Sequence, residues 1–356
     1  MPSDPSTVKN QSTSAMVELL TPIWRHVLQL PSINSDENFF DLGGDSALAL
    51  QLFNEIAEAC GRELPPVMIY HAPTIDSLAT LLEQSTPPRC PPVVLLKSGN
   101  PMPPVFITHG LGGSVMDFFQ VVKHMQCPNP IYGMQAKGLD GADEPFDDIA
   151  DMARFYLSAI KELQPRGPYL LIGFSLGGLV TLEMARLLCA TGEKVALLAM
   201  LDSYPHVRFL EPIQQLRLRL RLAKRHALLL SRLPIQDAVA YITRRSERRL
   251  RIPGDRSGKA RYQTSTATSP VIQRVRESAY LALTRYRPHP YRGKVKFVRA
   301  EISTDFPEDP AAVWSKFLGA IEIDTVPGDH LEIMTTHFEH LASLLSRYVR
   351  QAQDDQ

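Results

Sequence analysis

A proline-rich segment divides this chain of 356 residues into two stretches with different hydrophobic patterns. Residues 85–92 read STPPRCPP, so half of these positions are proline. Such a run cannot form a helix, because proline lacks an N–H donor and its ring clashes with the preceding turn; it favours an extended, semi-rigid linker. The sequence therefore predicts two domains joined by a linker, which we assign to residues 85–103.

The stretch before the linker has a helical pattern. MVELLTPIWRHVLQL ends at Pro31, SALALQLFNEIAEACG ends at Gly61, and Thr74 is the expected N-cap of a further helix, TIDSLATLLEQ. No strand pattern interrupts them, which predicts a small all-α domain over residues 15–84. Residues 1–14 are polar, and we expect them to be disordered.

After the linker, short apolar runs alternate with helical segments. The runs are PVFITHG, PIYGMQA, PYLLIGFS, VALLAMLDS and GKVKFVRAE. Strands that alternate with helices indicate a mostly parallel sheet covered by helices on both faces. We expect this second domain to occupy residues 104–356.

The charges cancel over the whole chain but are unevenly distributed. With 38 basic and 38 acidic residues, the chain lacks the excess positive charge of a nucleic-acid binder. Residues 207–262 contain fifteen Lys or Arg against four Asp or Glu, whereas residues 14–87 contain two Arg against ten acidic residues. The sequence thus combines an acidic helical domain with a basic segment.

Neither the apolar stretches nor the cysteines point to a membrane or a metal. No run of 18 apolar residues is present, and the N-terminus lacks the apolar core of a signal peptide. The spacing of Cys60, Cys90, Cys127 and Cys189 fits neither a metal knuckle nor a CxxC pair. We expect free thiols, no metal site and a cytoplasmic protein.

Ser46 is the first candidate functional residue. It ends the segment FDLGGDS, where Asp45 or Ser46 could also serve simply as a helix N-cap. Together, FFDLGGDSALALQLFNEIAEACGRELPP and YHAPTIDSLATLL resemble the peptidyl carrier domains of nonribosomal peptide synthetases over residues 15–84. The resemblance implies a four-helix bundle in which a phosphopantetheinyl transferase attaches 4′-phosphopantetheine to Ser46, so that an acyl or peptidyl group can be held as a thioester. Ala47 departs from the family, which usually has a larger aliphatic residue there.

Ser175 is the second candidate. An apolar strand pattern leads into GFSLG at residues 173–177, and a helical pattern follows, which is the context of a nucleophile elbow. Such a serine needs a base and an orienting acid, in the chain order Ser, Asp or Glu, His. Asp202 follows the strand pattern VALLAML, and His330 lies in the loop VPGDH. We therefore predict a triad of Ser175, Asp202 and His330.

Other residues fit these roles less well. The remaining candidate histidines are His109, His206, His337 and His340. The first precedes the nucleophile, the second lies too near Asp202 in sequence, and the last two fall on a terminal amphipathic helix. Asp329 is better suited to shaping the loop that contains His330.

An oxyanion hole requires two backbone N–H groups. Leu176, which follows the nucleophile, should supply one. Leu111, in the loop THGLGGS at residues 108–114, is the candidate for the other. A phosphate-binding P-loop is excluded because GLGGS lacks the lysine and the spacing of that motif.

Five segments together resemble the thioesterase domains that end nonribosomal peptide and polyketide assembly lines. They are HGLGGSVMDF, GFSLGG, LLAMLDSYP, YRPHPYRGKVKFVRAE and VPGDH. The resemblance covers residues 104–350 except for an insertion, and it implies an α/β-hydrolase fold, an acyl-enzyme on Ser175 and upstream synthetase modules that load the carrier. It also implies that residues 206–270 form a helical lid.

The basic insertion has other interpretations. The segment LRLRLRLAKRHALLLSRLP could lie on an anionic membrane surface or be a plain solvated helix. As a lid, its positive charge would attract the acidic carrier and shape docking.

These features predict a carrier-tethered thioesterase that releases an acyl or peptidyl chain by hydrolysis or macrocyclisation. The alternatives are a carrier or scaffold protein with an inactive or editing hydrolase domain, and a general esterase. The sequence identifies neither the acyl group nor the outcome of release.

Overall fold

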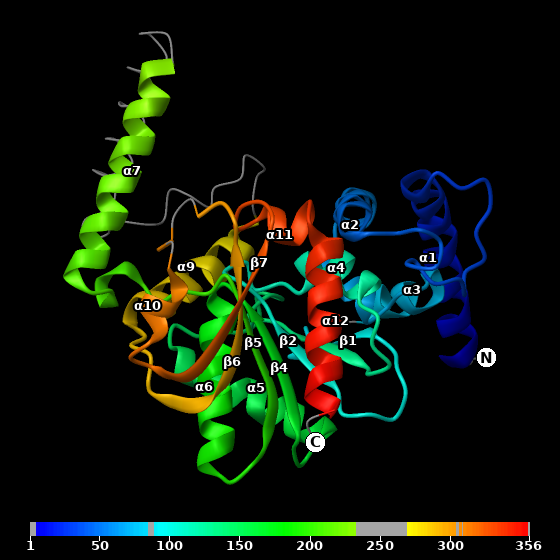
Figure 1. Ribbon diagram of the computed structural model, residues 1–356. Coiled ribbons are helices and arrows are strands. Elements are labelled where there is room, and N and C mark those ends of the chain that lie inside the picture. The colour runs from blue at the N-terminus through cyan, green and yellow to red at the C-terminus, as the bar shows by residue number, and fades with distance from the viewer. Residues whose placement is uncertain (1–4, 85–88, 233–268, 304–305, 308, 355–356) are drawn as a thin grey trace.

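The two domains differ in architecture, as the sequence predicts, and the smaller one contacts the larger near one end of its central sheet (Figure 1). The computed structural model describes residues 5–84, 89–232, 269–303, 306–307 and 309–354. Elements are named below as in Figure 1.

Within residues 5–84, the small domain is a bundle of three α-helices and one 3₁₀ helix. These are α1 (Pro5–Leu28), α2 (Ser46–Cys60), η1 (Pro66–Tyr70) and α3 (Ile75–Glu83). Trp24, Phe39 and Leu52 are fully buried among them. As expected, Thr74 is the N-cap of α3, where it forms a capping box with Ser77.

Helix α1 is longer than expected at its N-terminal end. It begins at Pro5, so residues 5–14, which we expected to be disordered, belong to this helix. No glycine or proline interrupts residues 6–21, and helix propagation from the packed part therefore meets no break. The helix ends at Leu28, before Pro31, because Gln29 adopts a φ of 54°.

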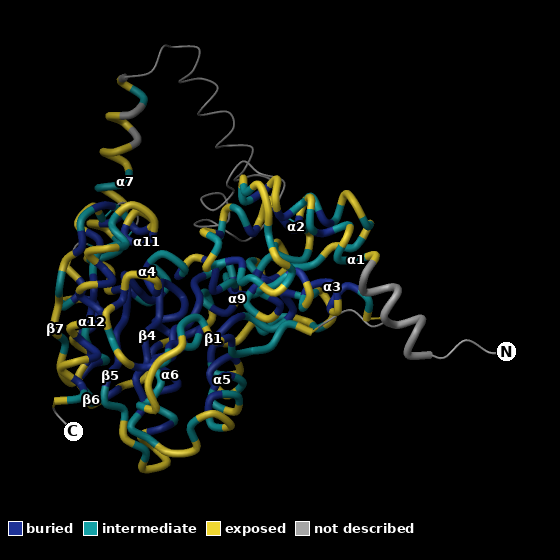
Figure 2. The backbone as a smooth tube through the Cα atoms, turned by 90° about the vertical axis from the view of Figure 1, so that its right-hand side faces the viewer, coloured by how far each residue is buried: buried dark blue, intermediate teal, exposed yellow. Residues whose placement is uncertain are grey.

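The large domain contains a seven-stranded sheet in the order β1-β3-β2-β4-β5-β6-β7. The strands are β1 (Val93–Lys97), β2 (Val105–Thr108), β3 (Ile131–Met134), β4 (Tyr169–Phe174), β5 (Val195–Leu201), β6 (Tyr291–Ala300) and β7 (Leu318–Val326). All neighbouring pairs are parallel except β1 with β3. The central strands β2 and β4 are buried along their whole length, as Figure 2 shows for the middle of the domain.

Strand β1 corrects the expected linker. Val93–Lys97 falls within residues 85–103, yet it pairs with β3 at the sheet edge, with Val93 opposite Met134. The apolar run VVLL after Pro92 can supply ladder hydrogen bonds, which the prolines cannot. The backbone N–H of Cys90 already donates to Asp140 Oδ2 at 2.9 Å, and Arg89 Nε lies 3.2 Å from the same carboxylate. Only the chain between Gln84 and Arg89 therefore joins the domains without a described anchor.

Helices cover both faces of the sheet. One face packs against α5 (Ile149–Leu163), α6 (Leu176–Ala190) and α9 (Pro270–Arg285), whose apolar residues share a core with Phe106, Leu171 and Phe297. The other face packs against α4 (Phe119–His124) and α12 (Phe338–Asp354), in a core that continues into the small domain. Short helices complete the fold: η2 (Met116–Phe118), η3 (Val207–Phe209), α10 (Pro310–Trp314) and α11 (Glu332–Thr335).

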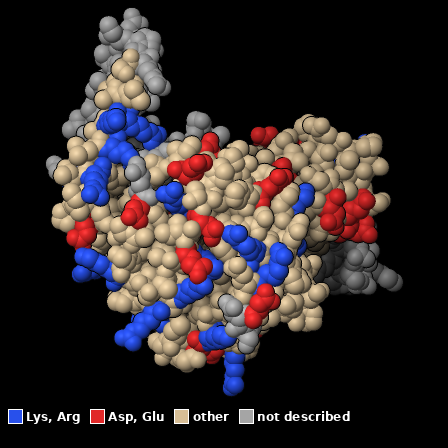
Figure 3. Space-filling view, in the orientation of Figure 1, with Lys and Arg blue, Asp and Glu red and all other residues tan. Residues whose placement is uncertain are grey.

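Helix α7 (Pro212–Arg232) belongs to the expected lid and projects from the side of the large domain opposite the small domain (Figure 1). Apolar side chains at helical spacing, those of Ile213, Leu216 and Leu220, are more than half exposed. Figure 3 shows Lys and Arg side chains gathered on α7 and Asp and Glu side chains on the small domain. Residues 233–268 of the expected lid lie outside the described residues, so its predicted attraction to the carrier stays a prediction.

Within the described ranges, no helix is long and apolar enough to span a bilayer.

Candidate functional site

Ser175 lies in a tight turn between β4 and α6. Its φ of 54° and ψ of −117° are sparsely populated for a non-glycine residue, and such strain is concentrated at functional sites. The turn depends on close backbone approach: a Cβ on Gly173 would lie 2.2 Å from the Gly177 carbonyl oxygen, and one on Gly177 would lie 2.4 Å from the His109 oxygen. Ser203 Oγ donates to the Ser175 carbonyl at 2.6 Å and holds the turn against the end of β5.

The three residues predicted as a triad meet in one hydrogen-bonded row. His330 Nε2 lies 3.1 Å from Ser175 Oγ, and His330 Nδ1 lies 2.7 Å from Asp202 Oδ2. All three residues are at least nine-tenths buried. Asp202 has a φ of 44°, a second strained position, and its Oδ1 accepts a hydrogen bond from the Ala300 N–H at 3.2 Å. Both carboxylate oxygens therefore have donors.

Two aromatic rings fix the plane of His330. Phe174 stacks on it with a centroid distance of 4.7 Å and an interplanar angle of 21°, and Phe306 packs at 4.9 Å. These apolar contacts limit ring rotation and keep water from its faces. The sequence analysis missed both residues. Phe174 could have been noted, because it is the residue before the serine in GFSLG.

The competing residues lie elsewhere or have other bonds. His109 is fully buried, with Nδ1 2.5 Å from the Gly110 carbonyl and Nε2 2.6 Å from the Tyr156 hydroxyl. Burial lowers the pKa of His109 to about 4, although the Gly110 hydrogen bond acts in the opposite direction. Asp329 Oδ1 accepts from the N–H groups at the start of α11, which is the loop-shaping role expected for it.

The predicted oxyanion donors fit the local backbone. Leu176 is the first residue of α6, and the first N–H groups of a helix lack intrahelical acceptors and lie at the positive end of its dipole. The loop that contains Leu111 passes close to the serine, since a Cβ on Gly110 would lie 3.7 Å from Ser175 Cβ. The assignment of the second donor to Leu111 stays a prediction.

Ser46 faces the large domain. It is the first residue of α2, but Asp45 forms the N-cap, with its Oδ1 2.9 Å from the N–H groups of both Ala47 and Leu48. The Ser46 hydroxyl is therefore not needed for the cap. Ser46 lines a cavity of about 310 Å³ whose other walls come from the large domain: Met116, Asp117, Gln120, Phe174, Leu331, Met334 and Thr335.

This cavity brings Ser46 close to the residues beside Ser175. Phe174, one of its walls, precedes Ser175 and stacks on His330. Most of the lining is apolar, and Asp117, Gln120 and Thr335 supply polar atoms. Burial raises the pKa of Asp117, and the charge of Arg276 opposes that effect. The chemistry of the walls fits a long flexible arm that has both methylene and amide groups, as 4′-phosphopantetheine does.

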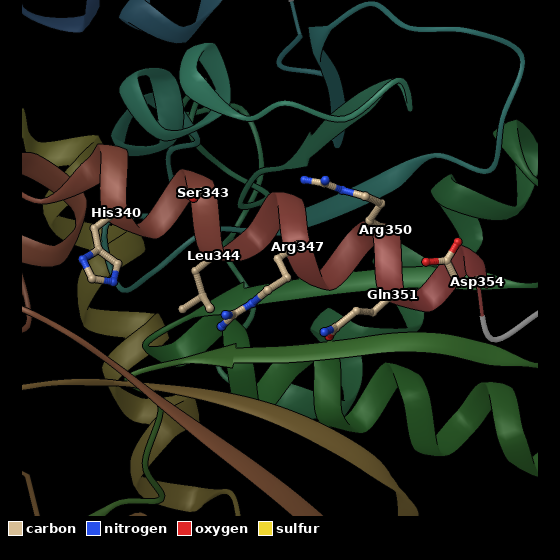
Figure 4. A pocket seen from close by; sticks show the side chains of 7 residues that line it. All are labelled: His340, Ser343, Leu344, Arg347, Arg350, Gln351 and Asp354. Carbon is tan, nitrogen blue, oxygen red and sulfur yellow. The ribbon is translucent and has the colours of Figure 1, made fainter.

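A second hollow, of about 380 Å³, lies along α12 and contains none of these residues. Figure 4 shows the side chains that line it: His340, Ser343, Leu344, Arg347, Arg350, Gln351 and Asp354. The described residues include no cluster of three or more His, Cys, Asp or Glu side chains suited to a metal ion.

Comparison with known protein families agrees with this division. The thioesterase domain model matches residues 103–348, and the phosphopantetheine attachment site model matches residues 18–82. The dimodular nonribosomal peptide synthase of Bacillus subtilis (strain 168) is 41% identical over 190 residues, which are 53% of this chain and 8% of that protein. Malpibaldin synthetase of Mortierella alpina is 29% identical over 320 residues, 88% of this chain and 5% of that protein.

Similarity to solved structures extends across both domains. The crystal structure of holo-AB3403, a four-domain nonribosomal peptide synthetase bound to AMP and glycine, aligns with a TM-score of 0.56 and 22% identity, and it covers 94% of this chain and 26% of that one. At this identity the match concerns the fold alone. The present chain spans less than a tenth of the length of the two synthetase relatives described above. Because the thioesterase model matches more than half of the chain, this protein belongs to the thioesterase domain family, and a phosphopantetheine attachment domain precedes that domain.

Proposed function

We propose that this protein releases an acyl or peptidyl chain from its own carrier domain, through an acyl-enzyme on Ser175. The observation that carries the proposal is the shared cavity: Ser46 lines it on the carrier side, and Phe174, next to Ser175, lines it on the hydrolase side. A general esterase acting on free substrates would have no need of a carrier serine at this position.

The prosthetic group would be attached to Ser46, and it would supply a thiol on which the cargo is held as a thioester. Met116, Leu331 and Met334 offer apolar surface for its methylene groups, and Gln120 and Thr335 offer polar atoms for its amides. Tethering supports release in cis, since a short linker gives an effective concentration on the order of mM.

The residues around Ser175 suit acyl transfer. His330 Nε2 is within hydrogen-bond reach of Ser175 Oγ, so it can accept the serine proton as the oxygen attacks a thioester carbonyl. Asp202 Oδ2 accepts a hydrogen bond from the His330 Nδ1–H group, which fixes the tautomer and stabilises the imidazolium. The N–H groups of Leu176 and Leu111 are the proposed donors to the oxyanion.

His330 then returns the proton to the departing sulfur, and an acyl-enzyme on Ser175 is left. A second nucleophile, activated by the same imidazole, resolves it. Water gives an acid, and an internal amine or hydroxyl gives a ring. The upstream modules that would load the carrier, and a phosphopantetheinyl transferase that would modify Ser46, are the partners that this function requires.

Intact-protein mass spectrometry tests the proposal. The wild-type protein and the Ser175→Ala variant are treated with a phosphopantetheinyl transferase and an acyl-coenzyme A, and their masses are followed over time. Both should gain the acylated arm, and only the wild type should lose the acyl group. A Ser46→Ala control should gain no mass.

Two results would contradict the proposal. If Ser46→Ala still gains the arm, the attachment residue is wrong. If the wild type retains every member of a panel of acyl groups as stably as Ser175→Ala does, the hydrolase domain is inactive.

A further inference from the structure

A row of aromatic rings joins the carrier to the hydrolase domain. Phe40, six residues before Ser46, stacks on Phe119 at the start of α4, with a centroid distance of 5.2 Å and an interplanar angle of 26°. On the carrier side Phe40 also stacks on Tyr70 at 4.7 Å and packs edge-on against Phe39 at 5.5 Å. Phe39 in turn contacts the buried Trp24 at 5.4 Å. The row therefore runs from the carrier core to the hydrolase surface.

Phe119 and Phe40 are each half-buried, unlike the core rings on either side. Lys123 lies one turn along α4, with its ammonium 5.7 Å from the centre of the Phe119 ring. The positive charge is attracted to the face of the aromatic ring. A second contact lies nearby, where Met68 of η1 meets Cys90 with the two sulfur atoms 3.6 Å apart. These contacts are apolar, and they lie beside the cavity that Ser46 lines, since Gln120, the residue after Phe119, is part of its wall.

Two reactions of the carrier make opposite demands on this interface. In modification, Ser46 Oγ bonds to the β-phosphorus of coenzyme A as the pyrophosphate bond breaks, and 3′,5′-adenosine bisphosphate and the serine proton leave. That reaction needs Ser46 accessible to a second enzyme. In hydrolytic release, Ser175 Oγ adds to the thioester carbonyl carbon and the C–S bond breaks, which gives a free thiol and an acyl-enzyme; water then cleaves the ester bond on Ser175, and an acid results. That reaction needs Ser46 at the cavity.

We propose that the Phe40–Phe119 stack is a latch that sets the balance between a docked carrier, competent for release, and an undocked carrier, competent for modification and loading. Phe119 and Phe40 are positioning residues; neither contacts Ser175. Four residues separate Gln84 from Arg89, so five Cα–Cα steps limit the reach of the carrier to about 18 Å when the latch opens. This inference rests on the proposed function.

The ratio of two rates measures the latch. With limiting transferase, the modification rate of the apo-protein follows the undocked fraction, whereas the single-turnover release rate follows the docked fraction. Their ratio therefore follows the docking equilibrium whichever state predominates. Loss of one aromatic pair should change that equilibrium by about two- to tenfold. We expect Phe119→Ala to raise the ratio of modification to release by this factor.

Phe119 is the better residue to change, because it lies on the hydrolase domain and a carrier-directed transferase has no need to contact it. Phe40→Ala should have a similar effect, and the double variant should equal either single variant, since each removes the same contact. Phe119→Tyr keeps the stack and should behave as wild type. The matched control is Phe155→Ala, a half-buried ring whose contacts with the rings of Phe146 and Tyr156 lie within the hydrolase domain.

Turnover of a free acyl-N-acetylcysteamine thioester separates this inference from the proposed function. Phe119→Ala should hydrolyse it at the wild-type rate, because Ser175 and His330 are unchanged. If the wild type fails to hydrolyse both free and tethered thioesters, the proposed function is wrong. The latch can then still be tested by the modification rate and by the rate of amide hydrogen exchange in η1 and α4. Phe119→Ala should increase the modification rate and the exchange rate. An unchanged ratio, additive single variants, or unchanged exchange together with an unchanged modification rate would overturn the latch.

Discussion

The buried imidazole of His109 should make the stability of the hydrolase domain depend on pH. Burial lowers its pKa from 6.5 to about 4. Above pH 6.5 His109 is neutral in both the folded and the unfolded chain. As the pH falls below 6.5, the unfolded chain takes up a proton that the folded chain does not, so stability is lost progressively down to about pH 4. The difference between the two pKa values corresponds to a loss of about 3 kcal/mol in the free energy of unfolding.

The perturbation is His109→Gln, which removes the titrating group but retains a donor and an acceptor near the Gly110 carbonyl and the Tyr156 hydroxyl. Between pH 7 and pH 4 the wild type should lose about 3 kcal/mol more unfolding free energy than the variant. Urea unfolding reports this quantity, because urea is uncharged. Fluorescence of Trp314 isolates the hydrolase domain when both proteins also contain Trp24→Phe, since the chain has only these 2 tryptophans.

The exposed His340→Gln variant controls for the loss of one imidazole. If wild type and His109→Gln lose stability in parallel from pH 7 to pH 4, then His109 is not held neutral in the folded protein. In that case the His109 ring that contacts the Gly110 carbonyl and the Tyr156 hydroxyl would not be neutral.

Three further predictions follow from the same geometry. Asp202→Asn should reverse the His330 tautomer and slow acyl-enzyme formation by about 10⁴-fold, measured in single turnovers; wild-type rates would refute the triad. Gly177→Ala brings a Cβ within 2.5 Å of the Thr108 carbonyl oxygen and should cost about 1–3 kcal/mol of stability; an unchanged melting temperature would show that the turn can relax. Asp117 keeps solvent contact at the cavity wall, but the protein atoms around its carboxyl group raise its pKa. Asp117→Asn should therefore stabilise the protein slightly at pH 7, and thermal melts should show this gain vanishing in acid, where Asp117 is protonated; a gain that does not depend on pH would contradict this cause.

The local motifs could be predicted from the sequence because a few neighbouring residues determine their geometry. The strand, GFSLG and helix pattern predicts the turn at Ser175, and the chain order predicts which acid and histidine follow it. Capping was also local: Thr74 caps α3 through Ser77, three residues away. In each case the interacting groups are close in sequence or belong to a pattern with a fixed order.

The ends of the helices, the strands and the linker were harder to predict from the sequence, because tertiary packing determines them. Val93–Lys97 looks like part of a proline-rich linker until its pairing with β3, 41 positions away at Val93 and 34 at Lys97, gives its backbone groups partners. Residues 5–14 are polar enough to suggest disorder, yet they continue a helix whose buried part begins further on. Neither result can be obtained from composition, since the stabilising contacts are not local.

The sequence by itself determined the two domains, their order and the identities of Ser46, Ser175, Asp202 and His330 as candidates, since each lies in a motif whose local chemistry is specific. Only the tertiary structure decided that Ser46 shares a cavity with Phe174 and that Phe40 stacks on Phe119. Those contacts join residues 79 or more positions apart, on surfaces of two separate domains. Their complementarity arises from shape and apolar burial rather than from any sequence period, and no pattern along the chain specifies it.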